Sequence, residues 1–246
     1  MKQTFFLIAI LLLLFGSCSS LNDSKKIESF EKTLGADNSK VLSEYVQAFE
    51  NQVLKKKYPT LPTDKAYSKL LSENPNSIAS MKLYELFTAY DLDKYFESQL
   101  WHEIYAPVDS VFIENSLLTA RFVYFSEEGK KKVGQSGGIS VNEMNRDSIV
   151  ERELSVCYFN NQGKYWQAIE SIRDGIPFLE EFYTTKNRMS YISIGHFSEM
   201  VKRHKLDLNN FLARRIVAVE LSKFINDARE PEKNTFANKG NRCTTP

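Results

Sequence analysis

The sequence contains few cysteines and almost no excess of either charge, and each shortage excludes a class of protein. Three cysteines in 246 residues are too few for a disulfide framework. Lys and Arg number 32 against 31 Asp and Glu, a formal net charge of +1. So weak a charge argues against nucleic-acid binding, whose affinity comes mainly from neutralised phosphates. We therefore expect no nucleic-acid partner.

Histidine is also scarce, with only His102, His196 and His204. A helical zinc site usually needs a second ligand four residues along, where the sequence after His196 has Met200. We predict no metal site and no cofactor. No set of nucleophile and base stands out, so we assign no catalytic residue, although His102 and Glu103 would suit acid–base chemistry if they faced a cleft.

Glycine is the third residue type in short supply, with ten in the whole sequence. Four of the ten fall between Gly129 and Gly138. Glycines can turn backbone N–H groups toward an anion, which makes this stretch a candidate ligand loop through Gly134, Ser136, Gly137 and Gly138. The segment satisfies neither the P-loop pattern nor G-x-S-x-G. A hairpin loop is the preferred interpretation, and the ligand loop is the alternative.

An unbroken apolar run from Phe5 to Phe15 follows Lys2. As a helix the run would extend about 16 Å, roughly half of the ~30 Å hydrocarbon core of a bilayer. It is too short to span. A basic residue, a short apolar run and the small residues Gly16 and Ser17 are the order of a secretory signal.

The sequence LFGSC, from Leu14 to Cys18, resembles the lipobox of bacterial lipoproteins. The resemblance implies cleavage between Ser17 and Cys18, diacylation of the Cys18 thiol and attachment to the cell envelope. Ser19 and Ser20 follow without an acidic residue, which implies the outer membrane of a Gram-negative bacterium. The resemblance covers only about the first twenty residues.

The two other cysteines, Cys157 and Cys243, could pair in an oxidising envelope. We instead interpret Cys157, in the run LSVCYF, as a small buried hydrophobic residue.

The chain is divided into a signal peptide (1–17), a tether (18–36), one globular domain (37–229) and a disordered tail (230–246). The tether could end in a short helix through 25–34. The predicted fold class is mainly α, as an α+β fold: antiparallel helices in 37–105 and 145–229, with a β-hairpin or three-stranded meander inserted near 108–135 and the whole β region bounded by 106–140.

Apolar spacing predicts helices over 38–57, with Asn38 or Ser39 as its cap, and over 63–74. A longer helical pattern runs from Asn76 to Tyr90 and restarts through 94–104. The hairpin is predicted from two β-rich segments with a tight turn at Asn115-Ser116.

Helical signals return after residue 145, while the run at Cys157 fits either a helix or a strand. Further helices are predicted over 164–172, from Pro177, and over 193–204. The last is predicted from Leu208 to about Ala228, capped by Asp207 and ended by Pro231.

Carboxylate pairs such as Asp91 with Asp93 and Glu180 with Glu181 could serve glycosidase chemistry only at a defined separation in space. Arg214 and Arg215 are adjacent in an amphipathic helix, so one must lie near its apolar face, and a partly buried ion pair is expected.

The sequence therefore favours a membrane-anchored envelope lipoprotein that binds a partner, such as an envelope protein, without catalysis. Two alternatives stay open. One is an envelope hydrolase with a dispersed carboxylate and histidine site. The other is a lipoprotein that neutralises an incoming toxin.

Overall fold

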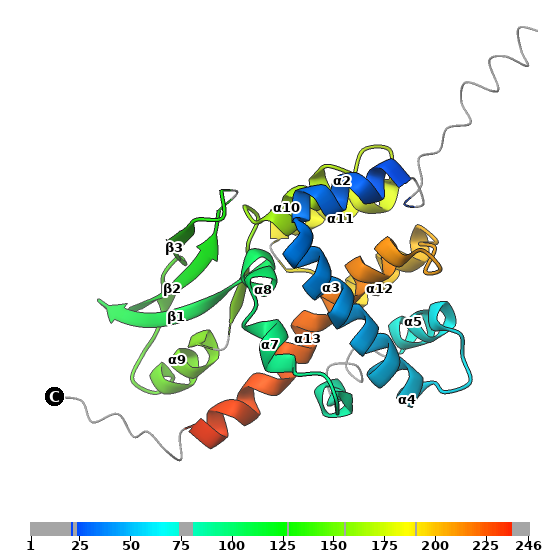
Figure 1. Cartoon of the computed structure of the whole chain (residues 1–246). Helices are drawn as coiled ribbons and strands as arrows, with labels where there is room; N and C mark the ends of the chain where they lie inside the picture. The colour runs from blue at the N-terminus through cyan, green and yellow to red at the C-terminus, as the bar shows by residue number, and fades with distance from the viewer. Residues whose placement is uncertain are drawn as a thin grey trace, which may run out of the picture.

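The computed structural model describes residues 21, 24–73, 81–126, 128–154, 156–189 and 191–237, with side chains up to residue 229. Figure 1 shows a mainly helical body with a small antiparallel sheet on one side, which confirms the predicted fold class. Cys18, Ser17 and Cys243 lie outside the described residues. Among those residues, no helix has the length and apolarity needed to cross a bilayer.

The first half of the chain is helical up to the sheet. Its elements are α2 (Ser24–Leu34), α3 (Ala36–Ala48), the π-helical η1 (Phe49–Leu54), α4 (Lys55–Lys57), α5 (Thr63–Ser72), the 3-10 helix η2 (Leu83–Leu86), α7 (Leu92–Phe96) and α8 (Gln99–Ile104).

Helix α2 confirms the short helix expected through 25–34 but shows it packed against the body. Phe30 and Leu34 are completely buried, and the Lys26 ammonium donates to the carbonyl oxygens of Ile172 and Asp174 at 2.8 and 2.7 Å. The packed body therefore begins by Ser24, because Phe30 and Leu34 recur at helical spacing and find a partner surface on α10.

The predicted helix over 38–57 is confirmed, but its start is different. It begins at Ala36, so Asn38 is not a cap; its amide donates instead to Leu34 O and to Glu103 Oε2. After α3 the helix continues as the π-helical segment η1 and then as α4. Such segments are rare and occur mostly as local insertions in α-helices.

The long helix predicted from Asn76 to Tyr90 is wrong for its described part, which has only η2 and turns. Residues 74–80 lie outside the described part. The restart is also divided, because Asp91 accepts the backbone N–H groups of Asp93 and Lys94 at the start of α7, and Ser98 accepts that of Trp101 at the start of α8. Each cap starts a new short helix.

The predicted hairpin is confirmed by β1 (Tyr105–Glu114) and β2 (Leu117–Phe125), which pair antiparallel. Asn115 and Ser116 between them have φ of 49° and 61°, as a two-residue hairpin turn of type I′ requires. The sheet is completed by β3 (Lys131–Gln135), β4 (Ile139–Ser140) and β5 (Cys157–Phe159), in the order β3-β2-β1-β5 with β4 also on β2. The run at Cys157 is thus a strand, and Cys157 is half-buried.

The second half of the chain supplies α9 (Arg146–Leu154), α10 (Lys164–Glu170), α11 (Pro177–Met189), α12 (Ile194–Arg203) and α13 (Phe211–Ala237). The first part of helix α13 lies among the other helices, and its last turns extend outward past α7 (Figure 1). Its buried residues include Ile216, Val217 and Val219.

Both predicted ends of the last helix are wrong. Asn210, not Asp207, caps the helix by accepting the N–H of Ala213 at 3.0 Å, while Asp207 closes the preceding turn by accepting the N–H of Asn209. The helix continues through Pro231 to Ala237. Proline costs a helix interior about 3 kcal/mol, and here that cost does not end it.

Candidate functional site

The glycine-rich stretch serves the sheet at three of its four candidate positions. Gly134 lies in β3 opposite Phe122, and a Cβ there would be 2.5 Å from the Phe122 ring. Ser136 exchanges two bonds with Ala120, donating its N–H to Ala120 O and accepting the Ala120 N–H on Oγ. Gly138 approaches Leu117 closely, whereas Gly137 is in open space. Close packing and strand pairing thus explain these residues without a ligand.

His102 and Glu103 do not form an acid–base pair. The Glu103 carboxylate is fully buried and accepts from Asn38 Nδ2 at 3.1 Å and from Gln99 Nε2 at 2.7 Å. His102 is half-buried beside Phe125. Burial first, and then the charge of Lys131, lowers its pKa.

The other histidines lie on α12 or at its end. His196 is exposed, and His204 Nε2 lies 2.7 Å from Glu181 Oε2. No cluster of three His, Cys, Asp or Glu side chains that could hold a metal ion occurs in the part of the chain that the structure describes.

The paired carboxylates have separate structural roles. Asp91 caps α7, and Asp93 pairs with Arg229. Glu180 accepts the N–H of Gly175, and Glu181 pairs with Arg203 and His204.

The ion pair expected at Arg214 or Arg215 is confirmed at both residues. Arg214 Nε lies 2.8 Å from Glu50 Oε1, and Arg215 Nη1 lies 2.8 Å from Glu31 Oε1. These pairs join α13 to η1 and α2, so the arginines stabilise the packing of segments distant in sequence.

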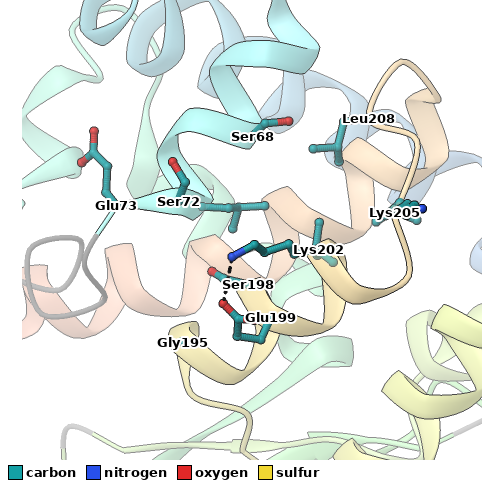
Figure 2. Close-up of a pocket in the computed structure, with 12 residues that line it drawn as sticks. Ser68, Ser72, Glu73, Gly195, Ser198, Glu199, Lys202, Lys205 and Leu208 are labelled. Carbon is teal, nitrogen blue, oxygen red and sulfur yellow. Dashed lines mark ion pairs between the residues drawn. The ribbon is translucent and has the colours of Figure 1, made fainter.

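A groove of about 660 Å³ lies between α5 and α12, closed at one end by the turn after α12. Figure 2 shows Ser68 and Ser72 on one wall, with Ser198, Glu199 and Lys202 on the other. Its volume lies within the range of ligand-binding pockets.

The groove has an apolar floor and a charged rim. Leu71, Val201, Leu206 and Leu208 supply the apolar surface. On the rim, Glu199 pairs with Lys202 at 3.6 Å, and Glu73 accepts the Tyr58 hydroxyl and pairs with Lys57. Lys205 forms no ion pair with any other described residue, so it gives this rim an uncompensated positive charge.

The lining contains three serines but no histidine or cysteine. Ser68 and Ser72 donate their hydroxyls to the carbonyl oxygens of Asp64 and Lys69 in their own helix. Neither hydroxyl is therefore activated by a base. The arrangement suits binding of an apolar group with a polar or negative end.

Lys205 is held in an unusual backbone conformation, with φ of 48°. Its N–H donates to Lys202 O, and the N–H of Leu206 donates to Val201 O. This is the Schellman ending of a helix, in which glycine normally occupies the left-handed position. The motif turns Leu206 toward the groove and places Lys205 at its rim.

Comparison with known proteins gives no family to which the chain can be assigned: no protein-family model matches it, and neither a curated protein nor a solved structure matches it significantly.

Proposed function

We propose that this protein is a lipoprotein of the bacterial cell envelope, anchored through acylated Cys18, whose helical domain binds a partner protein without catalysis. The partner segment is short and apolar, occupies the groove between α5 and α12, and places an acidic side chain against Lys205. The observation that carries the proposal is the combination of an apolar floor with an unpaired rim cation.

The anchor is supported by the LFGSC sequence behind a short apolar run. Two acyl chains, at ~0.8 kcal/mol per buried CH₂, contribute on the order of 20 kcal/mol, whereas one chain binds only marginally. Such an anchor would keep the protein permanently at the membrane surface, where the outer membrane is the proposed location.

Peptide binding is supported by the construction of the groove. Two helices supply its walls, and apolar side chains lie between them, as in grooves that accept apolar anchor residues of a partner. Among the described residues, Lys205 is the groove cation without an ion pair, and an acidic residue of the partner would compensate it.

The anchor is tested with Cys18→Ser in the native bacterium. We expect the variant to lose labelling by an alkynyl fatty acid and to accumulate as unprocessed precursor, while Ser19→Ala is labelled normally. Fatty-acid labelling of the Cys18→Ser variant would contradict the proposed anchor. It would not bear on the proposed binding in the groove.

The groove is tested by site-specific photo-crosslinking in the full chain. A photoreactive residue at Ser72, inside the groove, should give one defined crosslinked product, and the same residue at Lys69, outside the lining, should not. Lys205→Glu should abolish that product, because it reverses the rim charge, and the exposed control Lys65→Glu should preserve it. A product that survives Lys205→Glu, or that forms equally from position 69, would contradict the proposed docking.

A further inference from the structure

A second cavity lies between the inner edge of the sheet and helices α11 and α13. It has a volume of about 370 Å³ and shares no lining residue with the groove. Aromatic side chains dominate its wall, namely Tyr105 of β1, Tyr158 and Phe159 of β5, Tyr191, and Phe224 of α13. Its size and apolar walls suit one small organic molecule.

A buried ion pair forms the polar part of this wall. Lys186 Nζ of α11 lies 2.7 Å from Glu220 Oε2 of α13, and each side chain is 3% exposed. Burying two charges costs several kcal/mol per ion before their attraction is counted. A purely apolar wall would avoid that cost. Packing alone therefore does not explain why this wall contains an ion pair.

The Lys186 ammonium retains hydrogen-bonding capacity. It carries three N–H donors, and Glu220 is its hydrogen-bond acceptor among the described residues. The rings of Phe159 and Tyr105 lie 5.0 and 5.6 Å from Nζ. A ligand oxygen in the cavity could accept a further, charge-assisted hydrogen bond.

A second lysine contributes to the polar part of the wall. Lys223, one helical turn from Glu220 on α13, also lines the cavity, and its partner Asp227 does not. Lys186 is paired with Glu220 and Lys223 with Asp227, so these four charges balance. Each ammonium still has N–H donors that an acceptor oxygen of a ligand can use.

Tyr105 provides a further polar group. Its side chain is buried, and its hydroxyl has no hydrogen-bond partner among the described residues. Burial first, and then the charge of Glu220, holds the Tyr105 pKa well above its ordinary value, so the hydroxyl keeps its proton. A buried donor without a partner is destabilising, and a ligand oxygen that reached it would remove this cost.

We propose that this cavity is a binding site for a small apolar carboxylate, with the ligand body against the aromatic wall and its carboxylate against Lys186 and Lys223. The site is independent of the groove and of membrane anchoring. Its ligand class is set by the remaining N–H donors of Lys186, by the unpartnered Tyr105 hydroxyl and by the aromatic lining, and no chemical step is involved.

The test uses the full chain in lipid nanodiscs with ¹³C-labelled methionine and isoleucine methyl groups. The probes are indole-3-acetate and its neutral counterpart indole-3-acetamide, which differ little except in charge. We expect indole-3-acetate to shift the methyl signals of Met189 and Ile192, which line the cavity, and not those of the core residues Met200 and Ile169. Its dissociation constant should be at least about tenfold lower than that of the amide, which corresponds to about 1.4 kcal/mol.

Two variants test the charges. Lys223→Gln should weaken indole-3-acetate binding severalfold while leaving the buried pair intact. The double variant Lys186→Met/Glu220→Leu removes both buried charges together, so that neither is left unpaired, and should remove the preference for the carboxylate over the amide. Lys202→Gln in the groove is the matched control and should change neither affinity.

Three results would overturn the proposal. One is equal affinity of the unmodified protein for both probes. Another is an absence of shifts at Met189 and Ile192 at millimolar indole-3-acetate. The third is an unchanged preference for the carboxylate in both Lys223→Gln and the double variant, which would assign Lys186 and Glu220 to packing alone. Because Lys223→Gln leaves the buried pair in place, the proposal stays testable if the double variant fails to fold.

Discussion

Asn38 of α3 donates its side-chain amide to the carboxylate of Glu103 on α8 across 3.1 Å, and both residues are buried. The same carboxylate accepts from Gln99 one turn earlier in α8. Glu103 therefore connects two helices through amide groups.

Replacing Glu103 should destabilise the protein in proportion to the acceptors lost. Glu103→Ala leaves the buried Asn38 amide without this acceptor, and we expect a loss of about 3 kcal/mol in the free energy of unfolding. Glu103→Gln keeps one acceptor oxygen and should lose less. Urea denaturation measures both, and equal losses would contradict a hydrogen-bonding role.

Gly134→Ala should be destabilising while Gly137→Ala is nearly neutral. The added methyl group at 134 would meet the Phe122 ring, which also packs against Tyr158 at a centroid distance of 4.7 Å. Overpacking of this kind costs about 1–3 kcal/mol. Thermal unfolding measures both variants. Similar midpoints for the two would refute the packing explanation for glycine at 134.

Lys205→Gly should stabilise the protein. Lys205 occupies the left-handed region with φ of 48°, where a side chain is strained and glycine is not, so we expect a gain of about 0.5–1 kcal/mol. Glu199→Gly, at an exposed position inside α12, should instead lose about 1 kcal/mol. Denaturant midpoints compare them, and a loss at both positions would show that Lys205 stabilises the fold through its side chain.

Acid should destabilise the protein partly through His102. Burial and Lys131 lower its pKa in the folded state, so the unfolded chain binds a proton first as the pH falls. Stability from this group is complete above the unfolded pKa of about 6.5 and is lost as the pH falls toward the lowered folded value. His102→Gln should therefore show a smaller drop in melting temperature between pH 7 and pH 5.

The matched control is His196→Gln, at an exposed imidazole on α12. It should retain the pH dependence of the unmodified protein. If the melting temperature of His102→Gln fell as much between pH 7 and pH 5 as that of the unmodified protein, another group would be responsible for the acid sensitivity.

The sequence correctly predicted the elements whose conformation is determined by their own residues and not by packing. The turn at Asn115-Ser116 is one example, because the left-handed conformation at both positions is local chemistry. The helix α11 beginning at Pro177 is another. The short helix through 25–34 was also predicted, but its packing was not, because the polar residues around Phe30 and Leu34 favoured a tether.

Competing local choices explain the main errors. Between Asn76 and Tyr90 the apolar spacing is helical, yet the described residues form only η2 and turns, and the caps Asp91 and Ser98 then start two short helices. The predicted helix end at Pro231 is also wrong, because the helix continues through this proline to Ala237.

The groove could not be predicted, because its two walls are distant in the sequence and only packing brings them together. Ser72 of α5 and Lys202 of α12 are ordinary polar residues of amphipathic helices when each is read alone. The left-handed Lys205 carried no signal either, because glycine is the residue expected there.

Leu21 is already part of the hydrophobic core, and this fixes how far the body can stand from an acylated Cys18. Three residue steps separate the two positions, and a fully extended chain covers at most about 3.6 Å per step, or about 11 Å. The proposed lipoprotein would consequently rest against the headgroups instead of reaching outward on a stalk. Its orientation would be restricted, and any partner would have to approach along the plane of the bilayer or from the opposite side.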